Sequence, residues 1–338
     1  MDRVIVADLH LDSDPLTEYR WEIFSMLNTY CTINTINCVD ILGDLTEKKD
    51  KHDSSLVNRL VYSLEELTFQ GIKVRILMGN HDYIDSEEPF FGFLNQMEGI
   101  SFIYLPTMHK DTYFLPNTKN FSLPIFDKTP EYIYLHQPFM GAVAQGGYIL
   151  PEGIDPAIFN NIKSTIFSGD IHFPQKLGKV TYVGAPYHVY FGDTYQGRMI
   201  VIQNGKQDSY EFHNLFPKRI SKTIQSVAGL DTLDCIKNDQ IKIKVELEKD
   251  KYFMWDTIRE QVKQFCKDKE LVLVSLELKP IKNKEELIQE DDGQFYRVKE
   301  EPKDVIDRFS NNEKLTDEFV EVAYGVVNEA EKAKNKRV

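Results

Sequence analysis

Short apolar runs rich in β-branched residues alternate with longer helical stretches through the first half of the chain. Six runs have the length of a strand: 4–7, 38–42, 74–78, 132–135, 165–167 and 180–183. The stretches 16–30 and 54–70, between the first three runs, carry apolar residues at helical spacing. Near-continuous apolar strands that alternate with helices are typical of a buried sheet covered by helices. The sequence therefore predicts an α/β fold up to about residue 193.

The pattern changes after about residue 192. Runs at 199–203 and 209–213 flank Asn204-Gly205, a dipeptide favoured in tight hairpin turns. A basic connector at 217–219 follows, and then a strand at 241–247, a helical stripe at 255–265 and a strand at 271–278. We therefore expect one large domain over 1–213 and a small α/β module over 217–280.

The last segment, 282–338, begins with a polar and charged stretch that we interpret as a linker with short helical pieces. Beyond it, apolar residues fall on one side of a helix: Leu315, Phe319, Val322, Val326 and Ala330. This helix either packs on its own domain or docks a partner at the end of a charged tether. The pattern alone leaves both interpretations open.

Composition limits where the chain works and what it binds. The longest apolar runs are far shorter than the roughly 20 residues that a membrane-spanning helix needs. The four cysteines show no CxxC spacing, and the chain enters its first strand without a signal peptide, so we expect a cytoplasmic protein that binds no membrane. A formal charge of −13 disfavours non-specific nucleic-acid binding. A polyanionic substrate would therefore need bound cations or a local basic patch.

Metal-binding side chains follow five successive predicted strands. They are Asp8, His10, Asp44, Asn80, His81, Asp82, His136, Asp170 and His172. In an α/β sheet, ligands bind at the carboxyl ends of the strands. Carboxylate, amide and imidazole donors suit hard-to-borderline divalent cations. Each residue alone has an ordinary explanation, such as a turn or a core histidine, but the ordered set predicts a metal site.

Local spacing suggests how this set would work. Asp8 and His10 are two apart on what we expect to be extended backbone, so both side chains would leave one face and grip one ion. Asp44, on a turn opened by Gly43, could bridge two ions, and Asn80 offers a neutral carbonyl oxygen. Two cations roughly 3.5–4 Å apart can stabilise both the attacking and the leaving oxygen of a phosphoryl group.

The ordered motifs D-x-H, G-D, G-N-H-D, H and G-x-x-H resemble the calcineurin-like metallophosphoesterase superfamily over about residues 1–213. The resemblance implies a β-sandwich flanked by helices and two divalent metal ions, Mn²⁺ first and Mg²⁺ as the alternative. It implies these ligands: Asp8, His10, Asp44, Asn80, His136, Asp170 and His172. The family usually has G-H-x-H where this chain has Gly169-Asp170-Ile171-His172. Asp170 either ligates through oxygen, which we favour, or leaves a weak second site.

Within the superfamily, the chain resembles nuclease subunits of the SbcCD and Mre type. A helical stretch follows G-D-L, the phosphatase signature GDxVDRG is missing, and 178–193 is similar to the strand and loop of those nucleases. The resemblance implies a double-strand exonuclease and single-strand endonuclease of DNA repair, recombination and replication. It implies two-metal hydrolysis, a DNA-contacting capping module at 217–280, and a tail over 282–338 that docks an SMC-like ATPase in a homodimeric complex.

The resemblance also implies roles for further residues. His81 would protonate the leaving oxygen or stabilise the transition state, and Asp82 would orient His81 or its loop. Candidate contacts to DNA phosphates are Lys48, Lys49, Lys176, Lys179, Lys218 and Arg219, although such clusters are more often solvated faces. Two alternatives stay open: a small-molecule phosphodiesterase of the same superfamily, which has no evident need of the C-terminal segments, and a catalytically weakened scaffold.

Overall fold

The computed structural model describes residues 1–118 and 121–281, the strand residues 287–289 and 295–297, and positions 320, 322 and 324. The chain divides into two compact units. The first comprises Met1–Glu246 and Phe253–Lys279, and the second Leu247–Tyr252 and Pro280–Val338. Among the described residues, no helix has both the length and the apolar character to cross a lipid bilayer.

Two six-stranded mixed sheets form the body of residues 1–216. The first has the order β12-β11-β1-β2-β3-β4. Its strands are β1 (Arg3–Val6), β2 (Cys38–Leu42), β3 (Lys73–Leu77), β4 (Ile100–Ile103), β11 (Arg198–Gln203) and β12 (Lys206–Glu211). β1, β2, β3 and β4 run parallel, while β11 and β12 close one edge in antiparallel register.

The second sheet has the order β5-β6-β7-β8-β10-β9. Its strands are β5 (Thr107–His109), β6 (Thr112–Leu115), β7 (Tyr132–His136), β8 (Thr165–Gly169), β9 (Gln175–Leu177) and β10 (Val180–Tyr182). β6, β7, β8 and β10 run parallel, and β5 and β9 pair antiparallel at the two edges. The six predicted strands are therefore present, and they are divided between two sheets, as expected for a β-sandwich.

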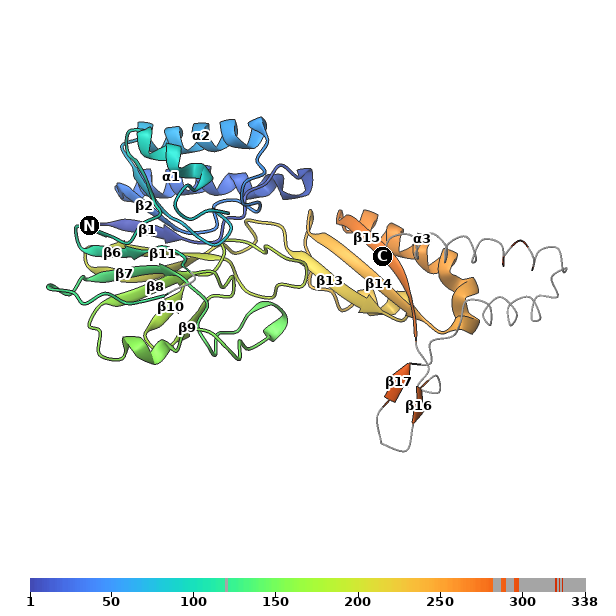
Figure 1. Cartoon of the computed structure of the whole chain (residues 1–338). Helices are drawn as coiled ribbons and strands as arrows, with labels where there is room; N and C mark the ends of the chain where they lie inside the picture. Colours follow the sequence, from blue (N-terminus) through green and yellow to red (C-terminus); the bar gives the residue numbers. More distant parts are fainter. Residues whose placement is uncertain are drawn as a thin grey trace. The chain divides into compact units, whose positions relative to one another are not determined.

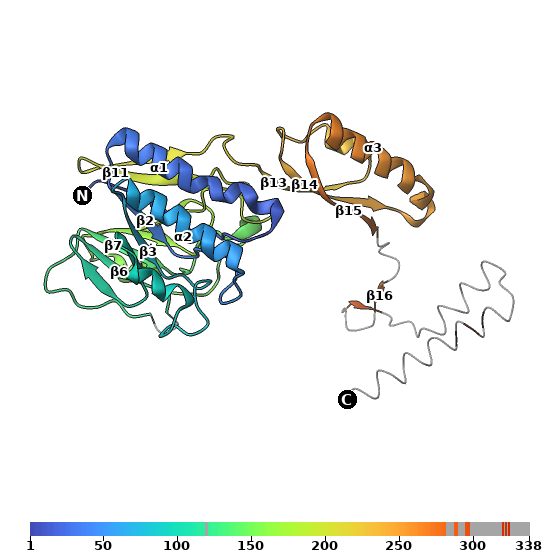
Figure 2. The same cartoon turned by 90° about the horizontal axis from the view of Figure 1, so that it is seen from above.

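Two long helices cover the outer face of the first sheet. These are α1 (Glu22–Asn34) and α2 (Ser54–Phe69), which lie side by side over β1, β2 and β3 (Figures 1 and 2). Asp53 caps α2 by accepting the backbone N–H of Leu56 at 2.8 Å. Shorter 3-10 turns are η1 (Pro15–Trp21), η2 (Phe90–Gln96), η3 (Gln145–Gly147) and η4 (Pro156–Phe159). The predicted α/β fold with helices flanking a sheet is confirmed.

Each central strand contributes to two cores because successive side chains point to opposite faces. In β2, Ile41 packs with Leu60 and Leu64 of α2, whereas Leu42 packs between the two sheets with Phe167. The interior thus has three layers: helices, first sheet and second sheet. Layers packed on both faces explain why these strands read as nearly continuous apolar runs.

The β11–β12 hairpin turns at Asn204-Gly205, as predicted. Both residues have positive φ, 52° and 73°, which a two-residue type I′ turn requires. Gln203 pairs with Lys206. The second strand therefore begins directly after the turn and not at residue 209 as expected, because its exposed polar residues conceal it in the sequence.

The module after residue 217 contains one strand more than expected. β13 (Arg219–Ile224), β14 (Gln240–Leu247) and β15 (Val272–Pro280) form one sheet, accompanied by α3 (Trp255–Asp268) and the turns η5 (Val227–Leu230) and η6 (Lys249–Met254). β13 occupies part of the stretch interpreted as a basic connector, and it pairs parallel to β14 with Ile220 opposite Ile241. The mixed polar sequence of β13 gives only a weak strand signal.

The predicted linker and docking helix fall largely outside the described residues. Within the linker, β16 (Leu287–Gln289) pairs antiparallel with β17 (Phe295–Arg297), where short helical pieces were expected. Of the predicted docking helix, only Val320, Val322 and Tyr324 are described, and all three are helical.

Candidate metal centre

The carboxyl ends of five strands from both sheets bring the predicted residues together. Asp8 and His10 follow β1, Asp44 follows β2, and residues 80–82 follow β3; His136 ends β7, and Asp170 and His172 follow β8. A cavity of about 370 Å³ lies at this edge. These predicted residues line it: His10, Asp44, Asn80, His81, Asp170 and His172. Asp8, Asp82 and His136 are fully buried.

The backbone at these positions is left-handed, so the expected extended conformation of Asp8 and His10 is wrong. Their φ angles are 57° and 44°, and Asp44 and Asp170 have φ of 52° and 80°. Positive φ is uncommon outside glycine, although Asp, Asn and His tolerate it better than most residues. Backbone hydrogen bonds from Asp8 N to Gly43 O (3.1 Å) and from His10 N to Asp44 O (2.9 Å) hold the first two turns together. Tight turns, not strand pleating, aim these side chains.

Two glycines let the turns approach closely. A Cβ added to Gly169 would lie 2.1 Å from the carbonyl oxygen of Leu42 and 2.7 Å from Nδ1 of His136. A Cβ at Gly43 would lie 2.0 Å from the same Nδ1. Such contacts are sterically impossible, so only glycine fits at either position. This explains why glycine precedes the aspartate in both motifs.

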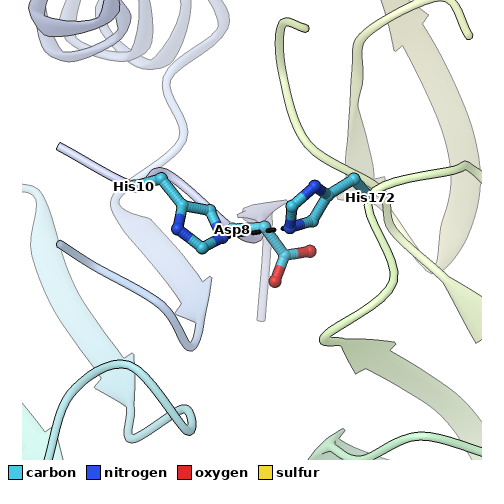
Figure 3. A group of neighbouring side chains, drawn as sticks. All are labelled: Asp8, His10 and His172. Carbon is cyan, nitrogen blue, oxygen red and sulfur yellow. Dashed lines mark hydrogen bonds between the residues drawn. The ribbon is translucent and has the colours of Figure 1, made fainter. Parts of the chain in front are cut away.

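The gathered side chains form three overlapping triads whose donor atoms lie within 4.8 Å of one another. They are Asp8–His10–His172, His10–Asp44–His81 and Asp8–Asp44–His136. Figure 3 shows the first, with the two imidazoles facing each other and their Nε2 atoms 3.0 Å apart. Because the triads share Asp8, His10 and Asp44, the arrangement is consistent with a two-metal site.

Several observations show that these residues fit divalent cations. Oδ1 of Asp8 accepts the backbone N–H of Asp170 at 2.9 Å, but its buried Oδ2 has no hydrogen-bond partner among the described residues. A buried carboxylate oxygen without a partner is costly, and a cation would satisfy it. The two Nε2 atoms of His10 and His172 converge in the same way. The mixture of carboxylate and imidazole donors suits a hard-to-borderline ion such as Mn²⁺.

The pKa values in the centre are shifted because several carboxylates are buried close together. Burial raises the pKa of Asp8 well above its usual range, and Asp44 adds to the increase. Burial alone would raise the pKa of Asp44 too, but His136, then His10 and His81, together lower it. Burial would lower the pKa of His136, yet Asp44, then Asp8 and Asp170, raise it well above its usual range. The imidazole of His136 is thus the shared partner of three carboxylates. Bound cations would reduce the repulsion among these carboxylates.

Hydrogen bonds fix the imidazoles so that Nε2 faces the cluster. Nδ1 of His136 lies 2.8 Å from the carbonyl oxygen of Leu42, and Nδ1 of His81 lies 2.7 Å from that of Glu47. Nε2 of His136 in turn lies 2.9 Å from Oδ1 of Asn80. A backbone acceptor at Nδ1 selects the tautomer that leaves Nε2 for a metal or a substrate.

Glu47 and Arg20 belong to the site but were missed in the sequence. The Glu47 carboxylate lies 3.1 Å from Nδ1 of His10, an ion-pair distance without hydrogen-bond alignment. Buried Arg20 donates to the carbonyl oxygens of His10 at 2.5 Å and Val189 at 2.9 Å. The position of Glu47, three residues after Asp44, is the one signal that could have indicated it.

Asp82 fastens two loops of the centre to each other. Its carboxylate accepts backbone N–H groups of Gly79 (2.7 Å), Asp44 (2.9 Å) and Leu45 (2.8 Å). Burial, then Asp44, raises its pKa to about 6. These contacts join the loop of His81 to the turn of Asp44.

The triads among the described residues omit Asp170, whose Oδ1 lies 3.8 Å from Nε2 of His136, so its metal ligation stays a prediction.

The basic residues predicted to contact DNA do not line this cavity. Four have exposed side chains: Lys48, Lys49, Lys176 and Lys179. Four make contacts within the protein: Lys49, Lys179, Lys218 and Arg219. Arg219 donates to the carbonyl oxygen of Val189 at 2.7 Å and packs over the ring of Phe191. Contact of all six with DNA stays a prediction.

Comparison with known proteins adds little. No protein-family model matches the chain. No curated protein matches it either. Among solved structures, it is similar to the crystal structure of the nuclease MPE of Pseudomonas putida, with 15% sequence identity over 62% of this chain and 87% of that one. The TM-score is 0.31, at which the similarity carries no argument about fold or function.

Proposed function

We propose that this chain is a metal-dependent phosphoesterase that hydrolyses phosphodiester bonds of DNA. The observation that carries the proposal is the set of three overlapping Asp/His triads at one cavity, with Asp8, His10 and Asp44 each shared by two of them. A site of this composition suits two divalent cations, Mn²⁺ first. Two bound cations would polarise a phosphodiester and balance charge on its attacking and leaving oxygens.

The chain's own residues supply the remaining functions. His81 lines the cavity with Nδ1 held by Glu47, so its Nε2 is the group that could give a proton to the leaving oxygen. The backbone N–H of His81 donates to Oδ1 of Asp44 at 2.8 Å, which keeps this imidazole beside the triads. No lysine or arginine of the described residues lines the cavity. Substrate charge would therefore be balanced by cations and imidazoles alone.

We further propose that the chain is the nuclease subunit of an SbcCD-like complex, with double-strand exonuclease and single-strand endonuclease activity in DNA repair, recombination or replication. In that complex it would form a homodimer with an SMC-like ATPase. The support is the motif order together with a small α/β module, β13 to β15 with α3, after the domain that carries the motifs. Co-expression with an SMC-like ATPase tests the assignment: the full chain should co-purify with it, and a chain lacking 282–338 should not.

The activity is tested with end-labelled duplex and single-stranded DNA, with bis-p-nitrophenyl phosphate as a small substrate, in Mn²⁺ and in EDTA. We expect Mn²⁺-dependent cleavage of all three. Cleavage of the small ester alone would indicate a small-molecule phosphodiesterase. Tight Mn²⁺ binding without any hydrolysis would indicate a scaffold.

His81→Ala tests the catalytic assignment. Loss of a positioned general acid should lower turnover about 10²- to 10⁴-fold, while Mn²⁺ stoichiometry stays at the wild-type value. His213→Ala is the matched control, because that histidine is 70% exposed and pairs with Glu211, away from the cavity. If Mn²⁺ binding disappeared together with turnover, His81 would be a metal ligand.

A further inference from the structure

The loop over 187–192, between β10 and β11, is bonded on one side to a turn of the metal centre. The link is Arg20, whose side chain is buried and lies 5.7 Å from the ring centroid of Tyr187. Arg20 donates to the carbonyl oxygen of His10 at 2.5 Å and to that of Val189 at 2.9 Å. One guanidinium therefore ties the backbone of a predicted metal ligand to this loop.

The other side of the same loop is bonded to Arg219, the first residue of β13. The backbone N–H of Arg219 donates to Nδ1 of His188 at 3.2 Å, and its carbonyl oxygen accepts the N–H of Gly192 at 2.8 Å. Its guanidinium donates to the carbonyl oxygen of Val189 at 2.7 Å and lies 4.5 Å from the ring centroid of Phe191. All of these residues belong to the first compact unit, so the loop joins β13 to the metal centre within one body.

The two guanidinium groups meet at a single acceptor, the buried carbonyl oxygen of Val189. A carbonyl oxygen has two lone pairs, so it can accept from both. Two cations on one oxygen repel each other. Carboxylates of Asp12 and Glu47, each 3.9 Å from Nη1 of Arg20, offset part of that repulsion. Because the acceptor is shared, a shift of Arg219 changes the position of the oxygen that Arg20 needs.

We propose that Arg219 is a positioning residue for the metal centre, although it does not line the cavity. Its bond keeps the Val189 carbonyl in place for Arg20, and Arg20 in turn holds the backbone of His10. The inference rests on the metal binding of the proposed function and not on the substrate that is hydrolysed. Coupling between two sites is reciprocal, so cations that fix His10 also stabilise the contacts between β13 and the loop.

The first test measures the Mn²⁺ affinity of Arg219→Gln by titration calorimetry on the full chain. The affinity should fall about 2- to 30-fold, the range expected for a residue that acts on a site through other residues. Lys242→Gln is the matched control, because Lys242 also lies over the ring of Phe191, 4.3 Å from its centroid, but makes no described hydrogen bond to Val189. Its affinity should equal that of wild type. An unchanged affinity in folded Arg219→Gln would refute the proposal.

A double variant separates the shared carbonyl from independent effects. Arg20→Lys should weaken Mn²⁺ binding by itself, because an ammonium group lacks the fork of a guanidinium that reaches both carbonyl oxygens. Adding Arg219→Gln to Arg20→Lys should then weaken binding little further, since residues that share a partner are not additive. Fully additive losses would show that Arg219 acts by another route and would overturn the inference.

Amide hydrogen exchange tests the coupling in wild-type protein, without any variant that must fold. Mn²⁺ should slow exchange of the N–H groups of Gly192 and Arg219, which hold β13 to the loop. Tight Mn²⁺ binding that left both rates unchanged would refute the coupling. Should wild type bind no Mn²⁺, the proposed function fails, and exchange of the His10 N–H in metal-free protein decides. Faster exchange in Arg219→Gln than in Lys242→Gln would support the positioning role, and equal rates would refute it.

Discussion

Two buried polar clusters within residues 1–216 balance their charges in opposite ways. Between the sheets, Arg75 binds Asp40 at two points, with Nε 2.6 Å from Oδ1 and Nη2 2.7 Å from Oδ2. Beside this pair, Arg3 binds Asp111 and donates to Thr112 at 2.6 Å. We call these four charged residues, Arg3, Asp40, Arg75 and Asp111, the interlayer cluster. Each of its carboxylates has a guanidinium partner.

The metal centre has no such compensation. Its carboxylates approach one another and share the imidazole of His136, and Oδ2 of Asp8 has no hydrogen-bond partner among the described residues. The pKa values differ accordingly. Burial would lower the pKa of Arg75, but Asp40 raises it, whereas burial and like charge both raise the pKa of Asp8. The interlayer cluster is complete as a part of the fold, whereas the Asp/His cluster has the donor set and the uncompensated charge of a site that cations would complete.

The largest effect is expected from breaking the interlayer cluster. Arg75→Met should lower the free energy of unfolding by about 3–5 kcal/mol, because it leaves Asp40 buried without a counter-charge. The double variant Asp40→Leu with Arg75→Met should recover most of that loss, since both charges are removed. Urea unfolding in EDTA measures both. A single variant as stable as wild type would show that Asp40 reaches another cation or takes up a proton.

Cation binding should stabilise the protein through the metal centre. Mn²⁺ at a hundred times its dissociation constant should raise the free energy of unfolding of wild type by about 2.7 kcal/mol per site. Asp44→Asn should lose most of this gain, because Asp44 contributes to two triads and a neutral amide bridges poorly. Asp208→Asn, at an exposed position of β12, is the control. Full Mn²⁺ stabilisation of Asp44→Asn would refute the bridging assignment.

A smaller effect is expected from Glu47, which orients a ligand without lining the cavity. Glu47→Gln should weaken Mn²⁺ binding about tenfold, because the carboxylate no longer supports the imidazole of His10. Titration calorimetry measures the affinity, and Glu211→Gln, beside exposed His213, is the matched control. An unchanged affinity would mean that the Glu47 carboxylate is a bystander and that only its backbone carbonyl matters.

The smallest effect has the opposite sign. Asp8→Asn should abolish tight Mn²⁺ binding and yet stabilise the metal-free protein by about 1 kcal/mol, because it removes a carboxylate from a crowded group. Asparagine also tolerates the positive φ of this position.

The pH dependence of that gain follows from the raised pKa of Asp8. Below about pH 4, where the unfolded carboxyl is protonated too, the variant should gain nothing. As pH rises from there towards the folded pKa, wild type loses stability and the variant does not, so the gain grows. Urea unfolding at several pH values in EDTA checks this, and destabilisation at pH 7 would contradict it.

The longer apolar strands and the helices could be predicted because their patterns are local, whereas short or polar strands such as β4, β6 and β13 were missed. The gathering of Asp8, Asp44, His136 and His172 could be predicted because carboxyl ends of parallel strands share an edge. The division into two sheets was implied only by the resemblance, since apolar strands buried on both faces read alike whichever sheet they join. The turns at Asp8 and His10 were also missed, because their positive φ depends on hydrogen bonds to residues far along the chain.

Glu47 shows a second limit of prediction. Its importance comes from contacts with His10 and His81, which lie 37 positions before it and 34 positions after it. Apart from its position three residues after Asp44, no local pattern distinguishes it from the other glutamates of this acidic chain. The same holds for Arg20, whose helical neighbours read as an ordinary amphipathic segment.

At the left-handed residues of the metal centre, the local backbone preference disagrees with the folded conformation, so the centre is locally frustrated. Asp8, His10, Asp44 and Asp170 hold conformations that cost about 1–3 kcal/mol each, and most of them also repel one another. The packed sheets beneath must supply the free energy that keeps these turns in place. In the metal-free protein, the turns should therefore exchange their amide hydrogens through local opening faster than the strands they follow, and cations should slow that exchange at the turns first.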